Sequence, residues 1–157
     1  MSSLAAVYGI EDTARRFGQY RWAELQLFEL LGEWARAADS SPEAVAMFAA
    51  HCHHHAWHAE LFAGRLPAVA GLDAPTATAP LSALVPLLDA ARAAEGTASR
   101  LRAVYHDVLP ALAAEYERHL MVTDPRIDGP TARALTLVLR DLADDREEGA
   151  TMLEQLG

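Results

Sequence analysis

The sequence lacks lysine and asparagine altogether and contains a single cysteine, Cys52. Without lysine, the chain has neither a Schiff-base amine nor the lysine of a phosphate-binding P-loop. One cysteine cannot form an internal disulfide, so Cys52 is either a small buried hydrophobic residue or a soft metal ligand. The glycine-rich dinucleotide motif, the G-x-S-x-G hydrolase motif and the C-x-x-C redox motif are missing as well.

Long apolar runs and basic runs are also absent. No apolar stretch approaches the ~18 residues that a membrane-spanning helix needs. The formal net charge of −9 and the pI near 5.1 disfavour nucleic-acid phosphate as a partner. The first residues do not have the basic and apolar regions of a signal peptide. We therefore expect a cytoplasmic protein that binds neither nucleic acid nor membrane.

Apolar residues recur with the helical period along most of the chain, and no segment alternates as a strand would. The pattern predicts a shorter helix over residues 81–94 and long helices over residues 5–38, 42–66, 98–122 and 131–156. Ser41 and Pro42 suit the N-cap and first turn of the second long helix. Pro110 predicts a bend in the third.

The links between the helices indicate the topology. Short links follow the first and third long helices, so the helices that each link joins should be antiparallel neighbours. Residues 67–96 form a much longer connection that can run back along the other helices. The 157 residues, of which 52% are hydrophobic, suffice for one domain with a sizeable core. We predict a single all-α domain over residues 1–157, an antiparallel four-helix bundle with one long crossover that carries the extra short helix.

Five of the seven histidines and the only cysteine fall within residues 51–58, on the second long helix. At ~100° per residue, His54 lies at the edge of the apolar stripe, while His53 and Trp57 face outward. The histidines predicted to face the core are His51, His55 and His58. This segment should therefore bring a group of imidazoles into the bundle.

The other long helices also carry ionisable residues on their apolar stripes. Glu24 points to the middle of the first stripe, Glu115 lies on or beside the third, and Asp145 lies in the fourth. Isolated buried carboxylates are costly, so a shared cation, or a proton shared with histidine, is the natural way to satisfy several of them. Further polar residues near these positions are Tyr20, His51, His119, Asp141 and Glu148.

With a metal-competent group on each long helix, nearly the whole chain resembles the ferritin-like superfamily of ferritins, bacterioferritins, rubrerythrins and di-iron oxidases. That family places a Glu on each of two helices and an E-x-x-H pair on each of the other two. Glu24 and Glu115 match the single-Glu positions. The segments His55-Ala-Trp-His58 and Asp145-Arg-Glu-Glu148 stand where the E-x-x-H pairs would be. These departures keep nitrogen and oxygen donors but change both motifs.

The resemblance implies a mono- or dinuclear iron or manganese centre that activates dioxygen or peroxide. The implied ligands are Glu24, His55, His58, Glu115 and Asp145. Carboxylates suit Fe or Mn, whereas the imidazoles also admit Zn, Cu or Ni. The alternative is a metal-free bundle in which histidines and carboxylates satisfy one another, acting as a non-catalytic binding or interaction module. The sequence names neither the small-molecule substrate nor the reductant.

Two tryptophans give an expectation about assembly. Trp22 and Trp57 are predicted to face outward on adjacent helices, with Leu30 near the first. Outward aromatic residues on neighbouring helices favour a self-complementary contact. We therefore predict a homodimer formed through the first two long helices.

Overall fold

The computed structural model describes residues 8–37, 39–67 and 79–157, and all regular structure in these ranges is helical. The predicted all-α fold is confirmed. The elements in chain order are α1 (Ile10–Ala35), α2 (Pro42–Ala63), α3 (Val85–Arg92), α4 (Thr97–Leu101), the π-helical segment η2 (Arg102–Val108), α5 (Leu109–Val122) and α6 (Gly129–Leu156). No helix in the described ranges is long and apolar enough to cross a membrane.

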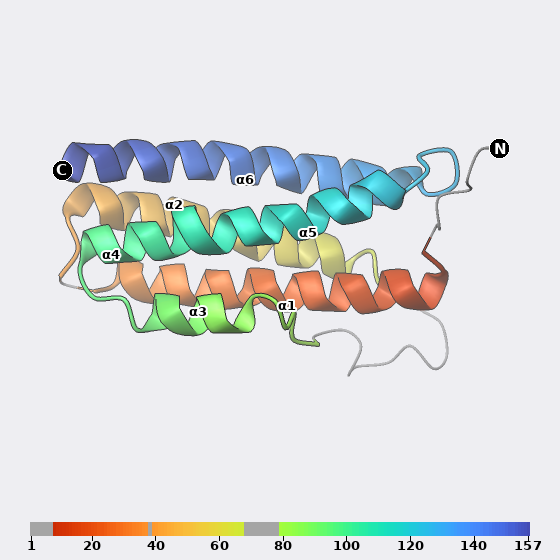
Figure 1. The fold of residues 1–157 in the computed structure, drawn as a ribbon, viewed down its shortest axis with the longest axis horizontal. Helices are drawn as coiled ribbons and strands as arrows, with labels where there is room; N and C mark the ends of the chain where they lie inside the picture. The colour runs from red at the N-terminus through yellow and green to blue at the C-terminus, as the bar shows by residue number, and fades with distance from the viewer. Residues whose placement is uncertain (1–7, 38, 68–78) are drawn as a thin grey trace.

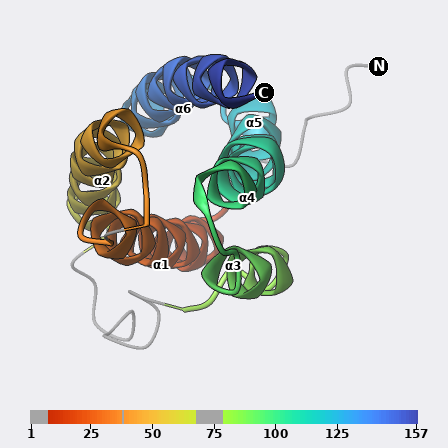
Figure 2. The same cartoon turned by 90° about the vertical axis from the view of Figure 1, so that its left-hand side faces the viewer.

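Four helical rods lie side by side, formed by α1, by α2, by α6 and by the continuous run of α4, η2 and α5 (Figure 1). The chain direction reverses between α1 and α2 and again between α5 and α6, as the short links predict. Seen end-on, α2 lies between α1 and α6, and the rod of α4, η2 and α5 lies across from α2 (Figure 2). The short helix α3 lies outside the four rods and packs beside η2. Of the predicted crossover, residues 68–78 lie outside the described residues.

The helix ends follow local signals in the sequence. The Ser41 hydroxyl accepts a hydrogen bond of 3.2 Å from the Ala44 amide, with a proline next in the first turn of α2. The Asp128 carboxylate caps α6 in the same way by accepting from the Thr131 amide. Gly96 has φ of 79°, a conformation that favours glycine, and it separates α3 from α4. The break that the sequence predicts between residues 94 and 98 lies between Arg92, where α3 ends, and Thr97, where α4 begins.

Residues 97–122 form one rod but not one uniform helix. Pro110 has no amide hydrogen for the carbonyl of His106, and its ring would crowd that carbonyl in a regular α-helix. The π-helical segment η2 lies directly before this proline. Because a π-helical turn takes more residues than an α-helical turn, core-facing positions beyond η2 come later than a uniform period predicts.

The interior is apolar along most of its length, and the residues that depart from this are few. The core includes Phe17, Leu27, Phe48 and Leu112, all fully buried. The buried polar or charged residues of the described ranges are Glu24, His51, His55, His58, His119, Thr131 and Asp145. Burying ionisable groups is costly unless they have partners, so these positions mark the site.

The position of Leu30 differs from the prediction, which placed it near Trp22 on an outward surface. It is buried in the core of the rods, so it does not extend an outward surface near Trp22. Trp22 itself is half-buried against the core, whereas 45% of the Trp57 surface is exposed.

Candidate metal centre

Helix α2 supplies the imidazoles of the site. Its four site histidines, at positions 51, 54, 55 and 58, follow the i, i+3, i+4, i+7 spacing that places side chains on one side of a helix. In Figure 2, α2 lies between α1 and α6. This side of α2 therefore meets carboxylates from both neighbours, Glu24 of α1 and the acidic residues of α6. The side chains form two groups along α2.

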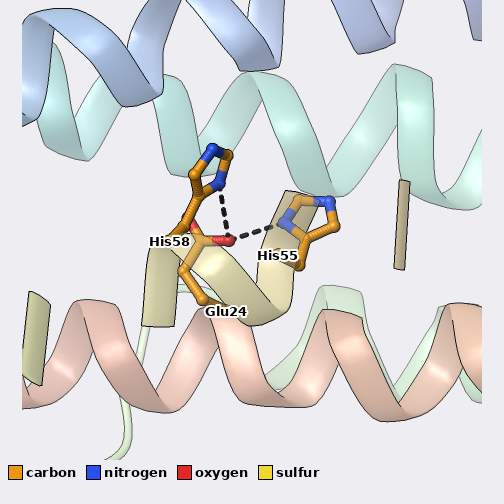
Figure 3. Close-up of side chains that lie close together, drawn as sticks. All are labelled: Glu24, His55 and His58. Atoms are coloured by element: carbon orange, nitrogen blue, oxygen red, sulfur yellow. Dashed lines mark hydrogen bonds and ion pairs between the residues drawn. The ribbon is translucent and has the colours of Figure 1, made fainter. Parts of the chain in front are cut away.

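The inner group consists of Glu24, His55 and His58, and all three residues are fully buried. Oε2 of Glu24 lies 2.5 Å from Nδ1 of His55 and 3.3 Å from Nδ1 of His58. Figure 3 shows both rings directed at the same carboxylate oxygen. One oxygen and two nitrogens, from two helices, therefore converge in the buried interior.

Two further residues, from α5 and α6, make polar contacts with the inner group. Tyr116, on α5, donates a hydrogen bond of 2.5 Å to Oε1 of Glu24. Asp141, on α6, lies with Oδ2 2.9 Å from Nε2 of His58. Nε2 of His55 is buried and has no hydrogen-bond partner among the described residues. The inner group thus has one polar atom still to be satisfied.

The charges within the inner group are coupled. Burial by itself would raise the pKa of Glu24, but the charges and hydrogen bonds of His58 and His55 outweigh burial and lower it to about 2. Burial likewise lowers the pKa of His58, and Glu24 together with Asp141 outweighs it and raises that pKa to about 9. At neutral pH and without metal, His58 is therefore a buried imidazolium between two carboxylates.

The outer group consists of His51, His54, Asp145 and Glu148. Nε2 of His51 lies 3.3 Å from Oδ1 of Asp145 and 3.0 Å from Oε2 of Glu148. Nδ1 of His54 lies 2.8 Å from Oδ1 of Asp145 and 3.1 Å from Oδ2. The side chains of His51 and Asp145 are buried, whereas 45% of His54 and 63% of Glu148 are exposed. This group therefore runs from the core to the surface.

A tyrosine also contacts a histidine of the outer group. The Tyr105 hydroxyl, on η2, lies 2.8 Å from Nδ1 of His51. Its ring packs against Gly149 of α6, where an added Cβ would meet the ring at 2.2 Å. Burial lowers the pKa of His51, and the charges of Asp145 and Glu148 offset only part of that effect.

The two groups share the interface between α2 and α6, where three histidine–carboxylate pairs follow one another. These pairs are His51 with Glu148, His54 with Asp145, and His58 with Asp141. On each helix the paired residues are separated by three and then four positions. Because the helices are antiparallel, that common spacing keeps the pairs in register (Figure 1).

The structure separates the five residues that the resemblance implies as ligands. Glu24, His55 and His58 lie together in the inner group, and Asp145 lies in the outer group. Glu115 belongs to neither group, because its side chain turns to Arg118 near the surface. The extra residue per turn in η2 explains this placement, since it brings Tyr116 rather than Glu115 to face the core.

The remaining polar residues named from the sequence have identifiable partners. His51, Asp141 and Glu148 contact the two groups as described above. The Tyr20 hydroxyl lies 3.0 Å from Nδ1 of His119. The Tyr20 ring packs edge-on against the ring of Tyr116. Burial lowers the pKa of His119 to about 4, and the Arg16 charge adds to that effect.

From the sequence, Tyr105 lies only at a margin of the third apolar stripe, His54 lies only at an edge of the second, and Tyr116 is not singled out. The proline inside a helical pattern was the signal for the phase change that brings both tyrosines to the core. Cys52 follows the structural interpretation, because its thiol donates to the Phe28 carbonyl on α1 at 3.3 Å and belongs to neither group.

The ligand atoms of Glu24, His55 and His58 all lie within 4.8 Å of one another, and so do those of His51, His54 and Asp145, so each set of three residues can hold a metal ion. Comparisons with protein-family models, curated proteins and solved structures give no significant match to this chain. The geometry of the two groups is therefore the basis for assigning a function.

Proposed function

We propose that this chain is a divergent ferritin-like oxidoreductase whose inner group holds one iron or manganese ion. The observation that carries the proposal is the convergence of Oε2 of Glu24 and Nδ1 of His55 and His58 on one another in the interior. The arrangement of the rods supports it, because α1 with α2 and α5 with α6 form two antiparallel pairs, as in that superfamily (Figure 1).

The contacts behind the ligands fit a metal centre. Metal-bound histidines donate their second N–H to a carboxylate or carbonyl, and metal-bound carboxylates are themselves hydrogen-bonded. Asp141 stands in that relation to His58, and Tyr116 stands in it to Glu24, whereas Nε2 of His55 has no such partner among the described residues. Binding at Nδ1 of His58 would release the proton that this nitrogen shares with Glu24, and the two positive charges of the ion would then offset the carboxylates of Glu24 and Asp141.

The chemistry of the donors limits the choice of ion. A hard carboxylate with two imidazoles suits Fe or Mn and also admits Zn, Cu or Ni. When bound, iron or manganese supplies redox chemistry towards dioxygen or peroxide. The residues of this chain contribute the rest: Tyr116 orients Glu24, Asp141 holds the proton on Nε2 of His58, and the apolar core excludes water.

The proposal is tested with tag-free protein loaded with Fe(II) under anaerobic conditions and measured by elemental analysis. Glu24→Gln should bind about one equivalent less than the wild type, because the amide keeps the shape but loses the anionic oxygen. Glu60→Gln, on the exposed side of α2, is the matched control and should bind as the wild type does. Consumption of dioxygen on exposure to air should fall with the lost equivalent. Equal iron content in the wild type and Glu24→Gln would refute the proposal.

One observation favours a second candidate, a metal-free bundle that acts as a non-catalytic interaction module. The contacts of 2.5 and 3.3 Å between Glu24 and the two histidines also satisfy these groups without an ion. Replacing a buried ionic cluster by apolar residues of similar size is often neutral or stabilising. On this account, the combination of Glu24→Leu, His55→Leu and His58→Leu keeps or raises the stability and leaves the cellular partners of the chain unchanged.

A further inference from the structure

We propose that the outer group is a second metal site, one that binds a divalent ion of the zinc type in four-fold coordination. Its donors are Nε2 of His51, Nδ1 of His54, an oxygen of Asp145 and Oε2 of Glu148. The inference goes beyond the proposed function and does not depend on it, because the two groups have no ligand in common.

The spacing of the donors fits a tetrahedral ion. With metal–ligand bonds of about 2.0 to 2.1 Å, two donors of a tetrahedral zinc site lie about 3.3 Å apart. His51 lies 3.3 Å from Asp145 and 3.0 Å from Glu148, and His54 lies 2.8 Å from Asp145. These pairs need to separate by only a few tenths of an ångström, and the ligand atoms of His51, His54 and Asp145 all lie within 4.8 Å of one another. Glu148, whose side chain is 63% exposed, would complete the four-fold site by rotating towards the ion.

The charge and the chemical type of the donors also fit. Two carboxylates supply two negative charges, and two imidazoles bind metal in their neutral form, so a divalent cation leaves the group neutral. Nitrogen and oxygen donors in equal number are common in zinc coordination and less suited to calcium or magnesium, which prefer oxygen alone.

The most buried imidazole of the group is already oriented. Tyr105 contacts Nδ1 of His51 at 2.8 Å, which directs Nε2 towards the two carboxylates. A hydrogen bond to the second nitrogen is the usual way in which proteins fix a metal-binding histidine. Gly149 leaves the space that the Tyr105 ring occupies, so α6 contributes to this orientation.

The outer group is open to solvent where the inner group is closed. The side chains of His54 and Glu148 are 45% and 63% exposed, whereas the three residues of the inner group are fully buried. An ion can therefore reach the outer group without any opening of the core. The outer group should load quickly in the folded protein.

The experiment uses tag-free, chelator-treated full-length protein titrated with Zn(II) in a calorimeter, and with Co(II) followed by its visible absorption. Wild type should bind one Zn(II) at the outer group, and Co(II) there should give the intense bands of a tetrahedral ion. His54→Gln and Glu148→Gln, both at partly exposed positions, should weaken this binding by about 100-fold or more. The buried variant Asp145→Asn should do the same. Glu147→Gln, the exposed neighbour, is the matched control and should bind as the wild type does.

The two sites are separated by variants of the inner group. Glu24→Gln should leave the binding to the outer group and its cobalt spectrum unchanged, whatever becomes of the inner group. Unchanged zinc affinity in both His54→Gln and Glu148→Gln would overturn the outer site. Loss of the tetrahedral cobalt spectrum in Glu24→Gln, with its retention in Glu148→Gln, would also overturn it and would leave the proposed function standing.

Discussion

Tyr116 donates a 2.5 Å hydrogen bond to Oε1 of Glu24, on the carboxylate oxygen that the two histidines do not contact. Both residues are fully buried, and they come from α5 and α1. The tyrosine therefore fixes the orientation of the one carboxylate in the inner group. It also leaves Oε2 directed at His55 and His58, where an ion would bind.

The Tyr116→Phe variant tests this relationship. Removing the hydroxyl leaves Oε1 of a buried anion without its donor, which should reduce the free energy of unfolding by about 1 to 3 kcal/mol. Affinity for Fe(II) or Mn(II) at the inner group should fall by about 10- to 100-fold. Urea unfolding and metal titration measure the two effects.

Tyr20→Phe is the control for that variant. The Tyr20 hydroxyl contacts His119 and not Glu24, so this change should reduce stability without altering metal affinity. Equal metal affinities in the wild type and Tyr116→Phe would show that Glu24 does not need the tyrosine.

Gly149→Ala tests the contact that positions Tyr105. A Cβ at this position would lie 2.2 Å from Cγ of the Tyr105 ring, so the ring must move away from His51. We expect a loss of stability of about 1 to 3 kcal/mol from overpacking, together with weaker zinc binding at the outer group. Gly129→Ala meets no atom within 4 Å and serves as the control. Similar unfolding midpoints for the two variants would contradict the prediction.

The core-facing residues of α1 and α2 could be predicted from the sequence. Both are regular helices, so counting at 3.6 residues per turn placed Glu24, His55 and His58 in the core correctly. The same count also placed Asp145 of α6 in the core, but on α5 it favoured Glu115 over Tyr116, because the π-helical turns of η2 change the phase. Neither the pairing of His54 with Asp145 nor the split into two groups could be derived, since both depend on the register between α2 and α6.

The free energy of unfolding should decrease as the pH is lowered from 6.5 to 4, because of His119. Its pKa is lowered to about 4 in the folded protein, by burial first and then by the Arg16 charge, which outweigh Asp128. The unfolded chain binds a proton at this histidine below about pH 6.5. Acid in this window therefore favours unfolding, by up to about 3 kcal/mol at its lower end.

The readout is the difference between wild type and His119→Gln, because other groups titrate in the same window. Glutamine can still contact the Tyr20 hydroxyl but does not titrate. The variant should lose less stability than the wild type as the pH falls from 7 to 4 in thermal melts. Parallel pH profiles would show that His119 is not responsible.

The predicted homodimer now depends on Trp57 and its neighbours on α1 and α2. Trp57 is 45% exposed and Phe28 is 37% exposed, whereas Leu30 is buried. Light scattering of the 17.0 kDa chain should give about twice the monomer mass at micromolar concentration. Trp57→Glu should produce monomers, and Met121→Glu, at an exposed position on α5, should not. A wild-type monomer would contradict the prediction.

The central claim is that Glu24, His55 and His58 hold a metal ion, and anomalous diffraction from crystals loaded with Fe(II) or Mn(II) tests it most directly. The account predicts an anomalous peak about 2.0 to 2.3 Å from Oε2 of Glu24 and from a nitrogen of each histidine. Tyr116 and Asp141 should keep their contacts behind the ligands. No peak at the inner group in crystals of loaded protein, with the direct contacts between Glu24 and the two histidines intact, would contradict it.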